Sequence, residues 1–123
     1  MRYIKAKYIE DYDASDPGEQ VFTGRCELLG VTYSRRGPAS GSNPDLPVRF
    51  RLYDGTSSSG TLLFEVNSGR TGDDQQITPV FNIFPDGTSM PCSTGIYFQY
   101  DNTTDSGSAV YAYPNTVTVL FSA

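Results

Sequence analysis

Acidic side chains near the start of the chain have a type and spacing that could bind a metal ion. Asp11 and Asp13 stand at alternate positions, as in the first part of a calcium-binding EF-hand loop. The sixth and twelfth positions of such a loop require Gly and Glu, but here they are Asp16 and Phe22. The EF-hand pattern therefore fails. An irregular calcium site, either here or in the acidic stretch 101–105, stays open as an alternative.

A second stretch, YDGTSSSGT, has the glycine spacing of a phosphate-binding loop. Such a P-loop reads GxxxxGK[ST] and lies between a strand and a helix. Gly55 and Gly60 fit that spacing, but Thr61 occupies the position of the essential Lys. The residues that follow, LLFEV, are typical of a strand, so no helix N-terminus is available to bind phosphate. The stretch instead predicts a hairpin turn in which the Asp54 carboxylate bonds backbone amides two residues further on.

Histidine is absent from the sequence, which limits the catalytic chemistry that the chain could perform. Ser-His and Cys-His catalytic groups are excluded, and so is the commonest transition-metal ligand. Glycoside hydrolysis needs two carboxylates that face one another, and only Glu27 and Glu65 fall within expected strands. Each lies on the polar face of its strand, and no pattern brings them together. We therefore predict that the protein is not an enzyme and has no cofactor, with a small carboxylate hydrolase as the enzymatic alternative.

The composition indicates a single all-β domain. The chain has 123 residues, of which 37% are hydrophobic, and it holds nine Tyr and seven Phe. Twelve Gly and eight Pro supply many turns, while aromatic and β-branched residues favour strands. The net charge of −5 argues against a nucleic-acid-binding module, which needs clustered Lys and Arg. No apolar run approaches membrane-spanning length and the first residues do not form a signal peptide, so we predict no membrane partner and synthesis in a cytoplasm.

The first twenty residues differ in charge pattern from the rest of the chain. Both lysines, Lys5 and Lys7, come first, and five acidic residues follow between positions 10 and 19. We interpret residues 1–20 as an N-terminal arm or linker and residues 21–123 as a single domain. The polar part is either a solvated linker or an arm that docks on a neighbouring subunit, and residues 2–9 are either an edge strand or part of that arm.

Short runs of alternating apolar and polar residues predict seven or eight strands, and no stretch shows the 3.6-residue period of a helix. Val21–Ser34 reads as a strand pair or one long bulged strand, with Gly24 and Gly30 at bulges or bends. Pro79 lies inside another run and predicts an edge strand or a bulge there. The pattern predicts an antiparallel β-sandwich, jelly-roll-like, or a small barrel. The remaining runs are 48–54, 61–66, 95–100 and 116–122.

Alternation within these runs assigns their side chains to opposite faces. The run 48–54 carries Arg49, Arg51 and Tyr53 on its polar face. The apolar faces of three runs consist of Val48, Phe50, Leu52, Leu62, Phe64, Val66, Val117, Val119 and Phe121.

Two cysteines, Cys26 and Cys92, are widely separated and form no CxxC pattern. We interpret them as small, half-buried hydrophobic side chains in a reducing compartment. A disulfide between them stays open, because the sequence does not give the distance between their Cα atoms.

Tyrosines and arginines are the side chains most suited to a binding surface. Tyr97, Tyr100, Tyr111 and Tyr113 crowd the last third of the chain, where they could stack on sugars or pack in a protein interface. The arginines at positions 35, 36, 49 and 51 suit an acidic partner. The predicted interface residues are Tyr3, Lys5, Lys7, Tyr8, Arg49, Arg51, Tyr97, Tyr111 and Tyr113.

Several stretches together resemble the small virion proteins of tailed bacteriophages. The matching residues are the hairpin at Leu52–Thr61, the strand at Gly95–Phe98 and the terminal strand at Val117–Phe121. The resemblance extends over Val21–Ala123 and leaves out the first twenty residues. It implies a compact β-sandwich that acts as a structural piece of the particle, in the capsid or in the tail.

From this resemblance we expect a non-enzymatic structural protein of the virion, assembled in the host cytoplasm. The leading hypothesis is a capsid decoration (cement) protein that binds the major capsid protein, or other virion subunits, and itself as a homo-oligomer. The alternative is a carbohydrate- or receptor-binding module of a phage tail or head appendage, which would take a surface glycan. Neither hypothesis calls for a nucleic acid, a membrane, a cofactor or a metal.

Overall fold

The computed structural model describes residues 3–9, 18–34, 49–67, 79–83, 89–100, 104–105, 108–109 and 116–123. Strands and the turns between them make up this part of the chain, and none of it is helical. A small separate ladder joins β9 (Thr104–Asp105) to β10 (Ser108–Ala109). The main strands are β1 (Ile4–Ile9), β2 (Gly18–Thr23), β3 (Cys26–Ser34), β4 (Arg49–Asp54), β5 (Thr61–Asn67), β6 (Pro79–Ile83), β7 (Met90–Cys92), β8 (Gly95–Tyr100) and β11 (Thr116–Ser122).

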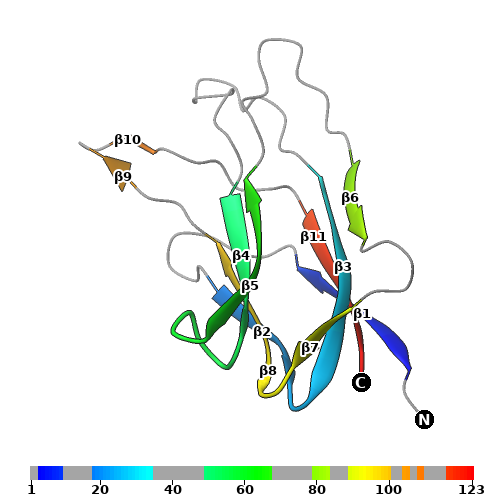
Figure 1. Ribbon diagram of the computed structural model, residues 1–123. Helices are drawn as coiled ribbons and strands as arrows, with labels where there is room; N and C mark the ends of the chain where they lie inside the picture. Colours follow the sequence, from blue (N-terminus) through cyan, green and yellow to red (C-terminus); the bar gives the residue numbers. More distant parts are fainter. Residues whose placement is uncertain are drawn as a thin grey trace.

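The main strands form two antiparallel sheets that pack face to face (Figure 1). One sheet has the order β1-β11-β3-β6, with β7 also pairing with β3, and the other has the order β2-β8-β4-β5. Both β6 and β7 pair with β3, so they can be counted together as one strand of the main set. With that count, β1 pairs with β11, β2 with β8, β3 with β6 and β7, and β4 with β5. This nested pairing is the winding of an eight-stranded jelly roll. The predicted jelly-roll-like sandwich is therefore confirmed, because the main described strands form two sheets and not one closed barrel.

The hydrophobic core lies between the two sheets, because alternate residues of the inner strands point inward. Aromatic rings connect the sheets across this space. The Tyr33 ring meets Phe50 edge-on with centroids 5.4 Å apart, and Phe22 lies 5.2 Å from Phe121. Fully buried aliphatic and aromatic side chains of both sheets include Leu28, Val31, Phe50, Leu52, Ile96, Phe98, Val117 and Val119.

A bulge in β5 changes one of the predicted faces. Leu52 pairs with Phe64, but the next residue, Tyr53, pairs with Leu62, so Leu63 is an extra residue in β5. The extra residue reverses the alternation on its N-terminal side. Leu62 is therefore 50% exposed, and the prediction that it shares the apolar face of Phe64 is wrong.

The Val21–Ser34 stretch is a strand pair divided between the two sheets, because β2 belongs to one sheet and β3 to the other. Gly24 lies at the bend between them with a φ of 122°, which favours glycine. A bulge in β3 lies beside Gly30: Leu120 pairs with Gly30 and Phe121 pairs with Leu28, which leaves Leu29 unmatched. Both predicted bend or bulge positions are confirmed.

Residues 4–9 form an edge strand, which is one of the two structures considered for this segment. β1 pairs along its length with β11, and the ladder continues through two hydrogen bonds of 3.2 Å between Tyr3 and Ala123. The two described ends of the chain therefore lie side by side (Figure 1). The boundary expected after residue 20 falls within β2. At the opposite edge of the same sheet, β6 begins with Pro79, as predicted for an edge strand.

Candidate functional site

Three turns meet at one end of the sandwich, at the bottom of Figure 1. They are the β2–β3 turn at Gly24, the β4–β5 turn that starts at Gly55, and the β7–β8 turn at Ser93–Thr94. The Gly24 N–H donates to the Thr94 carbonyl at 2.8 Å, and the Gly55 N–H donates to the Gly95 carbonyl at 3.3 Å. The two sheets are thus joined at this end by backbone hydrogen bonds between turns.

The Gln20 side chain reinforces the same junction. Its Nε2 atom donates to the carbonyl oxygens of Phe22 at 2.7 Å, Ile96 at 2.9 Å and Gly55 at 3.1 Å. Because these carbonyls belong to three separate segments, one amide group fixes their relative positions. The sequence offered no signal for this role, since a single Gln in a strand has no local partner.

The Asp54 carboxylate holds the β7–β8 turn through four hydrogen bonds, which we call the Asp54 clasp. The N–H and hydroxyl of Ser93 donate to Oδ2 at 2.9 and 3.2 Å. The N–H groups of Thr94 and Gly95 donate to Oδ1 at 2.9 and 3.2 Å. The sequence predicted that Asp54 bonds amides two residues further on. It instead binds amides about forty positions away, because the jelly roll brings the end of β4 beside the start of β8.

The clasp changes the acidity of Asp54. Burial alone would raise the pKa of this carboxyl, but the amide hydrogen bonds from Ser93, Thr94 and Gly95 and the Ser93 hydroxyl together lower it below its ordinary value of 3.8. The clasp is therefore made by the ionised carboxylate.

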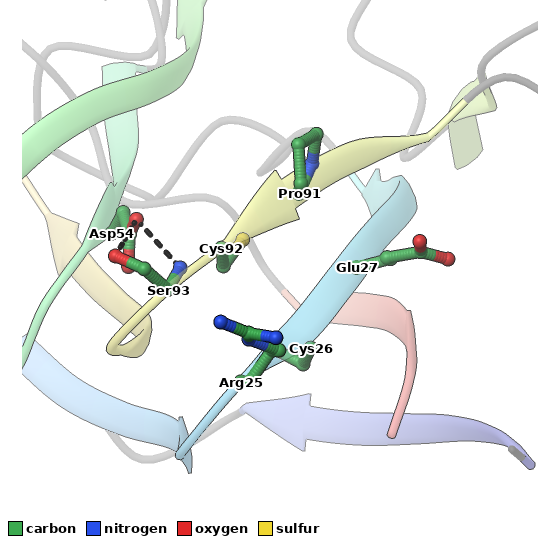
Figure 2. A pocket seen from close by; sticks show the side chains of 7 residues that line it. All are labelled: Arg25, Cys26, Glu27, Asp54, Pro91, Cys92 and Ser93. Carbon is green, nitrogen blue, oxygen red and sulfur yellow. Dashed lines mark hydrogen bonds between the residues drawn. The ribbon is translucent and has the colours of Figure 1, made fainter.

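A pocket of about 490 Å³ opens beside the clasp (Figure 2). Asp54 and Ser93 form one wall, and Arg25 with residues of β3 and β7 forms the others. The pKa of the Cys92 thiol is raised to about 12, mainly by burial and to a smaller extent by the nearby Cys26 and Asp54. A thiol with this pKa is protonated at neutral pH, so it does not serve as a ready nucleophile. The seven lining residues are Arg25, Cys26, Glu27, Asp54, Pro91, Cys92 and Ser93.

Replacing Asp54 with asparagine is expected to lower the free energy of unfolding at pH 7 by about 2 kcal/mol, because charge-assisted hydrogen bonds to backbone amides are lost. The native pKa of Asp54 is lowered, so its contribution is complete above pH 3.8 and disappears as the pH falls through the native pKa. Urea unfolding at pH 7 and near pH 2 should therefore show a difference between wild type and Asp54→Asn that shrinks on acidification. Glu19→Gln, which removes an exposed ion pair, should cost under about 1 kcal/mol. A difference that does not change with pH would contradict the clasp.

The structure places four predicted interface residues together along β1 and its start. Tyr3 is 61% exposed and Tyr8 is 53% exposed. Lys7 forms an ion pair of 3.2 Å with Glu19 of β2, and the Lys5 ammonium lies 5.4 Å from the centroid of the Phe22 ring. Both lysines therefore reach across the rim of the sandwich towards the second sheet.

The structure gathers three other predicted residues on the outer face of the second sheet. Arg51 donates to Glu65 at 2.6 Å and Arg49 donates to the same carboxylate at 3.4 Å. The bond to Glu65 is the main cause that raises the pKa of Arg51. Tyr97, from β8, lies opposite Tyr53 of β4 on the same face. Those predicted interface residues that the structure describes thus divide into a β1 group and a β4–β8 group.

Other predicted site residues are separated or lie elsewhere. Tyr100 is 2% exposed and belongs to the core, so it is not part of a surface cluster with Tyr97. Glu27 lies on β3 and Glu65 on β5, in different sheets. Several predicted positions fall outside the described residues: Arg35, Arg36, Tyr111, Tyr113, the acidic stretch 11–16 and part of 101–105.

In the part of the chain that the structure describes, no three His, Cys, Asp or Glu side chains lie close enough together to hold a metal ion. The same part contains no helix that is long and apolar enough to cross a membrane. No protein family, no curated protein and no solved structure matches the chain.

Proposed function

We propose that this chain is a non-enzymatic structural protein of a tailed-bacteriophage virion, most specifically a capsid decoration protein that binds the major capsid protein and itself. The observation that carries the proposal is the edge strand β1, which displays exposed apolar side chains at the rim of the sandwich. The resemblance in the sequence suggests the particle, and β1 suggests how the chain attaches to it.

Exposed apolar groups concentrate at β1. Ile4 is 77% exposed, and Tyr3 and Tyr8 are each more than half exposed. Among the described residues, the other large hydrophobic side chain of comparable exposure is Leu62, on β5 of the other sheet. A contiguous exposed apolar patch on a protein marks an interaction surface more often than scattered single residues do. Ile4 and Tyr8 share one face of β1, with Ala6 between them, and we take this row of side chains as the candidate surface.

The backbone of β1 is also suited to docking. One side of β1 pairs with β11, and no described strand lies on its other side. A partner chain in extended conformation could add a strand there and form main-chain hydrogen bonds, as in β-augmentation. Ile4, Ala6 and Tyr8 share the outer face of the strand, so an added strand would gain side-chain contacts as well.

The charges of β1 favour an unlike partner strand over a second copy of β1. Lys5 and Lys7 lie on one face of the strand, and two β1 strands in antiparallel pairing would bring these cations together. Lysines on an edge strand are a known means of preventing edge-to-edge association. We therefore assign β1 to the capsid protein, with an extended segment of different sequence as the expected partner, and self-association to a different surface.

The proposal is tested by co-sedimentation with shells of the phage that encodes the chain, prepared without this protein. Ile4→Asp, on the outer face of β1, should weaken binding by at least about tenfold, because a carboxylate would be buried against the partner. Leu62→Asp is the matched control, since it places the same charge on an exposed leucine of the opposite sheet and should bind like wild type. Equal binding by both variants would contradict the assignment of β1, and no binding by wild type would contradict the decoration role.

A second candidate function, glycan binding by a tail or head appendage, is favoured by one specific observation. Tyr53 and Tyr97 lie opposite each other on the outer face of the second sheet, next to Arg51 and Gln99, which also pair across β4 and β8. Tyrosine rings flanked by polar side chains can stack on sugars. Jelly rolls occur in both viral capsid and lectin domains, so the fold alone does not choose between the two functions.

Tyrosine fluorescence during titration with host surface polysaccharide separates these candidates. Glycan binding predicts a saturable change that Tyr97→Ala abolishes. The decoration role predicts no saturable change for wild type or variant.

A further inference from the structure

The two cysteines, far apart in the sequence, lie directly opposite each other in the fold. Cys26 on β3 and Cys92 on β7 are Cα partners in an antiparallel ladder. Residues at such positions have Cα atoms about 4.5 to 5.5 Å apart, which is within the range of about 4.4 to 6.8 Å that a disulfide requires. Both thiols are free in the structure, and Cys26 is near enough to contribute to the raised pKa of Cys92. The pair is thus already in position for a covalent bond.

The surroundings of the pair make it unreactive while β7 is in place. Cys26 is 2% exposed and Cys92 is 1% exposed, so the expectation that they are half-buried is wrong: both lie in the core between the sheets. The Cys92 thiol donates to the Met90 carbonyl at 3.4 Å. Burial and the neighbouring Cys26 and Asp54 raise the pKa of Cys92 to about 12, so very little thiolate forms at neutral pH. Both residues nevertheless line the pocket beside the Asp54 clasp (Figure 2). The pocket offers a small reagent a path to the sulfurs once β7 moves.

We propose that Cys26 and Cys92 are a latent cross-strand disulfide, which a small-molecule disulfide closes during local openings of β7. One cysteine thiolate attacks a sulfur of the reagent and displaces one thiolate, forming a mixed disulfide. The second cysteine thiolate then attacks the cysteine sulfur and displaces the other half of the reagent. The two cysteine protons pass to the two released thiolates, so the cysteines are oxidised by two electrons and the reagent is reduced to two thiols.

The opening of β7 is controlled by the segments that hold it. β7 is three residues long and pairs with β3. The residue after Cys92 is Ser93, whose N–H and hydroxyl are held by Asp54. Weakening the clasp should therefore increase the fraction of molecules in which β7 is open, and with it the rate of thiol reaction.

The disulfide would join β3 to β7 covalently. β3 lies inside the first sheet, and β7 leads directly into β8 of the second sheet. The closed loop contains more than half of the chain, and crosslinks across long loops restrict the unfolded chain most. The pair would therefore let a sandwich that folds with free thiols gain a covalent link after folding. This inference does not depend on the proposed function.

The test uses the reduced wild-type chain, incubated at neutral pH with excess oxidised glutathione and then alkylated under denaturing conditions. Mass spectrometry should show a monomer that has lost two hydrogens, with Cys26 and Cys92 in one linked peptide pair. Cys26→Ser and Cys92→Ser should each stop at a glutathione adduct. The Asp54→Asn variant should close about tenfold faster than wild type, because its clasp is weaker.

Wild type alone also decides the question, even if a cysteine variant does not fold. The oxidised chain should unfold at a temperature about 10 °C above that of the reduced chain, and dithiothreitol should reverse the shift. The inference is overturned if the wild type retains the glutathione adduct, forms a disulfide-linked dimer, keeps both thiols free after prolonged incubation, or closes the bond without a rise in unfolding temperature.

Discussion

Phe98→Ala is expected to lower the free energy of unfolding by about 4 kcal/mol, the largest effect of any substitution considered for this chain. Phe98 is fully buried, and its ring lies 5.5 Å from that of Phe50. It belongs to β8, which pairs with β2 on one side and β4 on the other, so the surrounding backbone has little freedom to close the cavity. A marginally stable domain of this size would lose a large part of its stability.

Urea unfolding at neutral pH measures this effect, with Leu120→Ala as the control. Leu120 is half-buried on the outer face of the first sheet, between the inward-facing Val119 and Phe121. Its truncation should cost about 1 kcal/mol, since it removes less buried area and leaves no enclosed cavity. Similar losses for the two variants would show that the core does not lie between the sheets as described.

Gly95→Ala is expected to lower the free energy of unfolding by about 3 kcal/mol or more, although it adds a single methyl group. Gly95 has a φ of 154°, and a Cβ atom there would overlap the carbonyl oxygen of Phe22. It would also lie 3.3 Å from the carbonyl oxygen of Gly55. Because backbone atoms on both sides belong to the junction of the three turns, neither can move without breaking its hydrogen bonds.

Gly24→Ala is the matched control for this second prediction. Gly24 also has a positive φ, 122°, but a Cβ atom there would meet the Phe22 ring at 3.5 Å, an ordinary contact. The control should therefore cost about 1–2 kcal/mol from backbone strain alone. Thermal or urea unfolding of both variants measures the difference. An equal or smaller loss of unfolding free energy for Gly95→Ala than for Gly24→Ala would contradict the close contact at Gly95.

Alternation predicted most of the strands correctly because each inner strand has one face in the core. Phe50 and Leu52 in β4, and Val117 and Val119 in β11, are buried as their spacing indicates. The face of Leu62 was wrong because the bulge in β5 arises from pairing with β4, which a single run of residues does not reveal. The jelly-roll order was foreseen only in outline, since which strands pair depends on contacts between distant segments.

The candidate site was much harder to predict than the strands. The turn beginning at Asp54 was recognised as a hairpin, but its carboxylate binds a turn about forty residues away, and no local pattern carries that information. The sequence left open whether Cys26 and Cys92 meet, because their position opposite each other depends on the register between β3 and β7. The exposed β1 was foreseen as an edge strand or an arm, because its alternating cations and apolar groups fit both.

The proposal that β1 docks a decoration protein on its capsid can be examined by amide hydrogen exchange of the full chain, free and bound to phage shells. Binding should slow exchange across Ile4–Ile9, because an added strand takes up the outer backbone groups of β1, while the β4–β5 turn at 55–60 should exchange as in the free chain. Protection that appears on the outer face of β4 and β8 and leaves β1 unchanged would contradict it.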